Sequence, residues 1–143
     1  MTKATLTPRL VVRGADEALE FYRRVFDARI EERYADDSGH VIQAEFSIGG
    51  ATIALTEEKR EWSNDAPTSL GGSPVILHLV VEDVDALGER LQAAGAQAIF
   101  PIADQFYGRR EGRFRDPFGH LWIVSKVIEQ LTPDQIRERM GQE

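Results

Sequence analysis

The same order of sequence patterns occurs twice along the chain, and this repeat constrains the fold more than any other feature. Each copy begins with an apolar strand, continues through an amphipathic helix and ends in three further strands. The copies cover about residues 6–58 and 74–127, so the period is roughly 67 residues. Alternating apolar residues mark the strands, and apolar residues three and four positions apart mark the helices. We therefore predict an α+β fold of two β-α-β-β-β modules.

In the first copy, the pattern predicts a helix from Asp16 to Phe26, and we expect the Asp16 side chain to cap it. Two polar or glycine-rich segments, Asp36-Asp37-Ser38-Gly39 and Gly49-Gly50, are typical of turns between strands. The strands of this copy are expected over residues 6–12, 28–34, 41–48 and 51–56.

In the second copy, Asp83 begins a helix that stops before Gly95. The segment Asp116-Pro117-Phe118-Gly119-His120 predicts a turn into the last strand, and we expect His120 at the surface. Thr132 followed by Pro133 predicts the start of a closing helix over about residues 131–141. The strands are expected over residues 74–81, 97–102, 105–115 (a strand or a hairpin) and 121–127.

Composition limits the classes of protein to which the chain can belong. Its 143 residues fit a single domain, and residues of about 59–73 form the one candidate linker. A net charge of −7 argues against nucleic-acid binding, which usually needs a basic face. The absence of cysteine and of long apolar runs is compatible with a cytoplasmic protein that neither spans a membrane nor needs disulfides.

Five short segments, in this order, give the chain a family resemblance that covers nearly all of it. They are 18–22 (Ala-Leu-Glu-Phe-Tyr), 41–46, 77–85, 104–108 and 112–120, which includes the Asp116–His120 turn. With them the chain resembles the glyoxalase/bleomycin resistance/dioxygenase superfamily, also called vicinal oxygen chelate (VOC) proteins, and within it the PhnB-like branch. The resemblance implies two modules that form a cupped mixed sheet around a cavity, and a homodimer. In many members it also implies a divalent metal ion that activates the substrate.

The positions at which such members hold the metal carry poor ligands here. By the register of the resemblance these positions are Thr7, Ile76 and Ile123. Isoleucine has no donor atom, and a threonine hydroxyl is a weak ligand. We therefore predict no metal cofactor at the usual site. The remaining possibility is an atypical site that combines Gln43, Glu45 and His78.

Other polar residues on the predicted inner faces are candidate ligand-binding or catalytic groups. Strand alternation places His78 on the face of Ile76, and Gln43 with Glu45 on one face of their strand. Arg9 or Arg113 could pair with Glu45, because a carboxylate inside a closed cup needs a partner. A structural ion pair and a hydrogen-bonded core histidine remain the alternative interpretations of Glu45 and His78.

Aromatic residues and one basic segment complete the candidates. Trp62, Phe106 and Tyr107 lie in predicted loops or strand edges, where they could line a ligand mouth or a dimer seam. The segment from Arg109 to Arg115 is more typical of a solvated hairpin than of an anion site. Apolar residues expected to face the cavity are Val11, Ile76, Val80, Leu121 and Ile123.

Two classes of function follow. The first is a metal-independent protein that binds a small hydrophobic or aromatic molecule, with drug sequestration as one role. An acidic chain attracts cationic compounds, which fits this class. The alternative is a lyase, isomerase or epimerase of glyoxalase type, with or without a divalent metal, in which Glu45 or His78 acts as the base.

Overall fold

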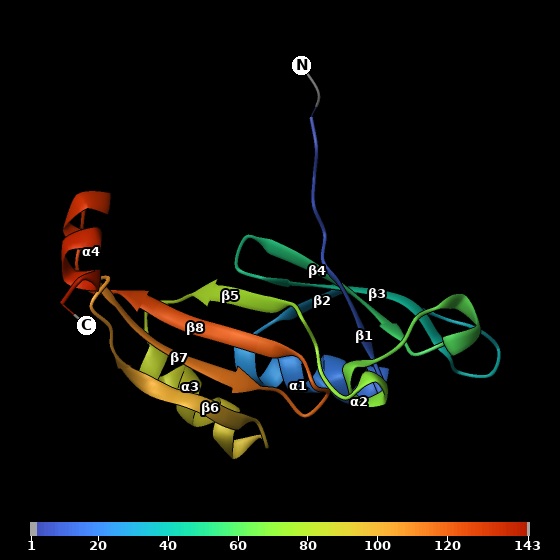
Figure 1. The fold of residues 1–143 in the computed structure, drawn as a ribbon. Helices are drawn as coiled ribbons and strands as arrows, with labels where there is room; N and C mark the ends of the chain where they lie inside the picture. Colours follow the sequence, from blue (N-terminus) through green and yellow to red (C-terminus); the bar gives the residue numbers. More distant parts are fainter. Residues whose placement is uncertain (1–2, 143) are drawn as a thin grey trace. The chain divides into compact units, whose positions relative to one another are not determined.

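Each half of the chain forms a four-stranded sheet with one long helix, as the computed structural model shows for residues 3–142 (Figure 1). The first unit extends to Ser73 and the second begins at Pro74. The first contains β1 (Arg9–Val12), α1 (Ala15–Phe26), β2 (Arg29–Ala35), β3 (Val41–Ile48), β4 (Ala51–Glu57), the 3-10 helix η1 (Arg60–Trp62) and α2 (Pro67–Leu70). The second contains β5 (Ile76–Val80), α3 (Val84–Ala93), β6 (Gln97–Asp104), β7 (Arg109–Arg115), β8 (Leu121–Val127) and α4 (Pro133–Met140).

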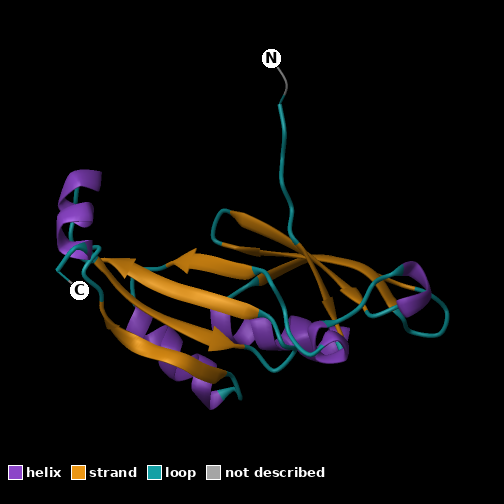
Figure 2. Cartoon of the chain, viewed as in Figure 1, coloured by secondary structure: helices purple, strands orange, loops and turns teal. Residues whose placement is uncertain are grey.

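The two sheets have the same topology. Their strand orders are β1-β4-β3-β2 and β5-β8-β7-β6. In each, the first strand runs parallel to the last, and the remaining pairs are antiparallel. The predicted α+β fold with two β-α-β-β-β modules is confirmed, and Figure 2 shows the same succession of strands and helices.

One face of each sheet packs against its own helix and forms the core. In the first unit, the Tyr22 ring of α1 stacks on Phe46 of β3 with 5.1 Å between centroids. In the second unit, buried Leu87 and Leu91 of α3 accompany buried Trp122 and Val124 of β8. Burial of such side chains is the main source of stability, at roughly 1.5–3 kcal/mol each.

The cap of α1 differs from the prediction. Asp16 does not cap the helix; Gly14 holds the N-cap position in the left-handed conformation with φ 97°. The amides of Gly14 and Ala15 instead donate to the Glu57 carboxylate at the end of β4, at 2.9 Å each. Asp16 forms an ion pair with Arg33. A carboxylate distant in sequence satisfies the helix start, which local patterns cannot reveal.

Several element ends also differ. β1 begins at Arg9, three residues later than predicted, and Leu6 is 93% exposed. The segment expected as a linker contains η1 and α2. The closing helix begins as predicted, with the Thr132 hydroxyl accepting a hydrogen bond from the Gln135 amide. Within the described residues, no helix combines the length and apolar character that crossing a membrane would require.

Candidate functional site

A cavity of about 260 Å³ opens on the face of the second sheet that α3 does not cover. The position of α3 is clear from Gly88, where an added Cβ would lie 3.5 Å from the Phe114 ring. Since alternate residues of a strand point to opposite faces, Arg113 and Ile123 lie on the other side. The cavity is lined by Phe100, Gln105, Tyr107, Glu111, Gly112, Arg113 and Ile123.

Strand register places the main polar residues of this face in two neighbouring rows. The first row runs from His78 of β5 through Ile123 and Arg113 to Phe100 of β6. In the second row, Ser125 of β8 pairs with Glu111 of β7. The rows bring together residues that are up to 47 positions apart in sequence.

Glu111 is the centre of a polar cluster in these rows. The Tyr107 hydroxyl donates a hydrogen bond to its Oε2 atom, and His78 Nε2 lies 3.8 Å from its Oε1 atom. His78 Nε2 also lies 2.8 Å from the Ser125 hydroxyl, which accepts a hydrogen bond from Arg109. The Glu111 side chain is only 16% exposed, so neighbouring donors replace much of its hydration.

The phenol of Tyr107 is held in its neutral form. Burial first, and then the hydrogen bond to Glu111, raise its pKa to about 12. A neutral hydroxyl donates one hydrogen bond, and here that bond fixes the carboxylate at the cavity wall.

This shift predicts how stability depends on pH. A pKa raised in the folded state favours the protonated phenol, so this contribution is fully present below the unfolded value near pH 10 and is lost as pH rises toward 12. We expect Glu111→Gln to lower the pKa of Tyr107 without restoring its ordinary value, because burial remains. Ultraviolet titration of phenolate measures the change, and Tyr107→Phe identifies its signal. An unchanged titration curve in Glu111→Gln contradicts the proposed coupling.

Arg113 is the least satisfied charge at the cavity. Its Nε atom is buried and has no hydrogen-bond partner within residues 3–142. Its guanidinium lies over the Phe100 ring, 5.3 Å from the centroid. A cation–π contact of this kind stabilises the charge only partly.

The turn that carries Tyr107 is fixed from the C-terminal end. Arg139 of α4 donates to the Phe106 carbonyl at 3.0 Å and forms an ion pair with Glu129. The amide of Ile128 donates to the Gly108 carbonyl. The closing helix therefore anchors the 105–108 turn beside the cavity.

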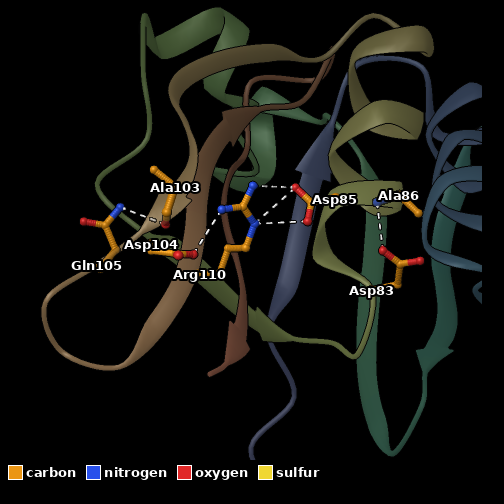
Figure 3. A network of polar contacts seen from close by, with 7 residues as sticks. All are labelled: Asp83, Asp85, Ala86, Ala103, Asp104, Gln105 and Arg110. Carbon is orange, nitrogen blue, oxygen red and sulfur yellow. Dashed lines mark hydrogen bonds and ion pairs between the residues drawn. The ribbon is translucent and has the colours of Figure 1, made fainter. Parts of the chain in front are cut away.

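A second set of contacts fixes the opposite face of β7. Arg110 donates to Asp85 of α3 and to Asp104 of β6, with closest N···O distances of 3.0 Å to each (Figure 3). Hydrogen bonds to Asp85 and then to Asp104 raise the pKa of Arg110. Gln105 donates to the Ala103 carbonyl in the same region (Figure 3). These contacts hold the strands that support the cavity, while Arg110 itself faces away from it.

The candidates predicted in the second unit lie in or beside the cavity. Tyr107, Arg113 and Ile123 line it. His78 does not line it but lies next to Glu111, which does. Phe106 is not among the lining residues; its ring packs edge-on against Tyr107 at 5.1 Å. Ile76 and Val80 share the face of His78 but are not among the lining residues.

The sequence interpretation missed Phe100, Gln105 and Glu111. The charged segment Arg109–Arg115 resembled a solvated hairpin, yet Arg109, Glu111 and Arg113 alternate along β7 and are half-buried. That alternation is the signal that could have identified Glu111. His120, expected at the surface, is only 9% exposed.

The candidates in the first unit are not among the residues that line this cavity. Arg9 is exposed on β1, whereas Gln43 and Glu45 are half-buried on β3. Within the described residues, no ion pair joins Arg9 to Glu45, and the buried Oε1 of Gln43 lacks a hydrogen bond. Trp62 is 54% exposed and lies under the Lys59 ammonium, 3.9 Å from the ring centroid.

The residues at the three expected metal positions do not fit a metal ion. Ile76 and Ile123 have no donor atoms, and Thr7 offers only a hydroxyl. In residues 3–142, no group of three or more His, Asp or Glu side chains is arranged so that it could hold one.

Comparison with known proteins establishes the family. Residues 5–124 match the Glyoxalase/Bleomycin resistance protein/Dioxygenase superfamily. The chain therefore belongs to this superfamily, as the sequence segments indicated. An uncharacterized protein of Mycobacterium bovis is 38% identical over 139 residues, which cover 95% of this chain and 91% of that protein.

Solved structures show the same fold. TioX from Micromonospora sp. ML1 is 25% identical, with a TM-score of 0.68 over 87% of this chain and 99% of TioX. A PhnB protein from Bacillus cereus is 20% identical, with a TM-score of 0.69 over 87% of this chain and all of that one. The fosfomycin resistance protein FosX from Listeria monocytogenes, solved with Mn(II) and sulfate, is 19% identical; its TM-score is 0.70 over 98% and 99% of the two chains.

Proposed function

We propose that this superfamily member binds a small aromatic molecule without a metal ion, in the cavity of its second unit. The observation that carries the proposal is the cavity wall itself. Phe100 and Ile123 supply apolar surface, and Tyr107, Glu111 and Arg113 supply a few fixed polar groups. Ligand sites commonly combine apolar walls with a small number of oriented polar groups. Drug sequestration is one role that such binding would serve.

The size of the cavity limits the ligand. Its volume of about 260 Å³ lies just below the roughly 300–1,000 Å³ of sites for drug-sized compounds. The wall is also more polar than the apolar cavity expected from the sequence. A small ring system with a polar substituent fits this wall better than a purely hydrophobic compound.

Filling the cavity tests the proposal. With the fluorescent aromatic amine N-phenylnaphthylamine as the probe, we expect saturable binding that a chelator does not change. Ile123→Trp should weaken it at least about tenfold, because the larger ring occupies the space the probe needs.

Ile42→Trp is the matched control, since Ile42 is a partly exposed isoleucine on β3 of the first unit and does not line the cavity. It should leave probe binding unchanged. Binding that requires a divalent ion, or that survives Ile123→Trp, contradicts the proposal.

A second candidate, acid–base catalysis next to a carbonyl, is favoured by one contact. His78 lies 3.8 Å from Glu111, which lines the cavity, whereas Glu45 lies on β3 of the first unit. Such an enzyme should exchange the hydrogen next to the carbonyl of a bound ketone in heavy water, and His78→Gln should abolish the exchange. Exchange that persists in His78→Gln excludes His78 as the base.

We also propose that the chain forms a homodimer. Sedimentation velocity of the purified chain measures its oligomeric state. A single monomeric species at micromolar concentration would contradict the homodimer.

A further inference from the structure

The two charged side chains that line the cavity, Glu111 and Arg113, differ in how well neighbouring groups bind them. Glu111 has Tyr107 at one carboxylate oxygen and His78 near the other. The buried Nε atom of Arg113, two residues away on the same face of β7, has no hydrogen-bond partner within residues 3–142, and the guanidinium lies over the Phe100 ring. A partly buried guanidinium without an anion is energetically costly, and an incoming anion would offset this cost.

A second arginine adds to the positive charge of this face. Arg109 lies on the other side of Glu111 along β7, and it contacts Ser125. The positive charges of Arg109 and Arg113 both act on the Tyr107 phenol, in the direction that lowers its pKa. Arg109 does not line the cavity, but with Arg113 it places two cations beside the single carboxylate of Glu111, so this face is locally positive although the chain carries a net charge of −7.

The apolar residues of the cavity wall lie beside the Arg113 guanidinium. Phe100, Arg113 and Ile123 occupy one row of the sheet, so the guanidinium lies between an aromatic ring and an aliphatic side chain. The Phe100 side chain is 58% exposed and can therefore contact a ligand. Arginine forms two parallel hydrogen bonds to a carboxylate, which fixes the orientation of a planar anion.

We infer that the ligand is a small aromatic monoanion whose acidic group binds Arg113 while its ring contacts Phe100 and Ile123. This inference rests on the proposed binding function and specifies its ligand class. It also reverses the preference for cationic compounds that net charge alone suggested.

Three probes of matched shape test the inference: cinnamate, cinnamamide and cinnamylamine. They share a ring and a short unsaturated chain, and they differ in charge. By calorimetry on the full chain in chelator, we expect cinnamate to bind about tenfold more tightly than cinnamamide, since hydrogen bonds to a charged group are the stronger ones. Cinnamylamine should bind most weakly.

Variants of β7 localise the effect. Arg113→Gln should reduce the affinity for cinnamate to that for cinnamamide and leave cinnamamide binding unchanged, whereas Arg113→Lys should retain part of the preference. Arg115→Gln is the matched control, because Arg115 lies on the same face of β7, contacts Gln97 and does not line the cavity. Unchanged cinnamamide binding also shows that each variant is folded.

The outcomes separate this inference from the proposed function. Equal binding of cinnamate and cinnamamide, or tightest binding of cinnamylamine, overturns the anion inference and leaves small-molecule binding intact. A preference for cinnamate that survives Arg113→Gln also overturns it. If none of these probes nor N-phenylnaphthylamine binds at millimolar concentration, the proposed function fails and the inference fails with it.

Discussion

Asp116→Ala is expected to destabilise the protein by about 3–5 kcal/mol, because one buried carboxylate serves three donors. Asp116 is 2% exposed. Its Oδ1 atom accepts from the amides of Phe118 and His120, at 2.9 and 3.0 Å, and its Oδ2 atom accepts from the Trp122 indole at 2.9 Å. A buried donor that loses its acceptor costs roughly 1–3 kcal/mol, and the three losses are not fully additive. Urea unfolding followed by tryptophan fluorescence measures the change.

Asp116→Asn should lie between the wild type and the alanine variant. One amide oxygen can still accept from the turn amides, but the amide NH2 group would then face the Trp122 indole N–H. Asp36 provides the matched control, since its Oδ1 atom accepts from the amides of Ser38 and His40 in a turn of the same form. That turn is exposed and binds no indole, so Asp36→Ala should cost clearly less. Equal losses in the two alanine variants would contradict the role of burial and of Trp122.

These two turns show what sequence could and could not predict. Both have the pattern Asp-x-x-Gly-His, and both were expected as turns because Asp and Gly favour the required conformations. The pattern did not reveal that only Asp116 reaches a buried tryptophan, since Trp122 is brought to it by the return of β8. The order of strands and helices was predictable because it depends on local periodicity. The cap of α1 was not predictable, because the Glu57 carboxylate that satisfies it lies 43 residues from Gly14.

The candidate site was predictable to a similar extent. Tyr107, Arg113 and Ile123 were named from loop position, charge and family register, and they line one cavity. Glu111 and Phe100 were missed for different reasons. Glu111 stood among arginines and looked solvated, whereas the position of Phe100 opposite Arg113 depends on an irregularity in the β6–β7 register. Such a shift follows from tertiary packing and leaves no local periodic signal.

Gly108→Ala is expected to destabilise the chain by roughly 2–5 kcal/mol and to weaken ligand binding at the same time. Gly108 has φ +86°, a conformation that costs an alanine about 1–2 kcal/mol. An added Cβ would also lie 2.7 Å from the Glu129 carbonyl oxygen, a backbone atom that cannot rotate away. Overpacking of this kind adds roughly 1–3 kcal/mol.

Gly39→Ala separates these two effects. Gly39 has φ +87°, and nothing lies within 4 Å of the position of its added Cβ. Gly39→Ala should therefore lower the free energy of unfolding only by the conformational cost, about 1–2 kcal/mol. Gly108 directly follows Tyr107. A shift of the turn away from Glu129 should therefore also move the phenol away from Glu111 and reduce the affinity for N-phenylnaphthylamine. Gly39→Ala should leave this affinity unchanged. Equal stability losses in the two variants would exclude the contact with Glu129, and unchanged probe binding in a folded Gly108→Ala protein would exclude the 105–108 turn as part of the binding site.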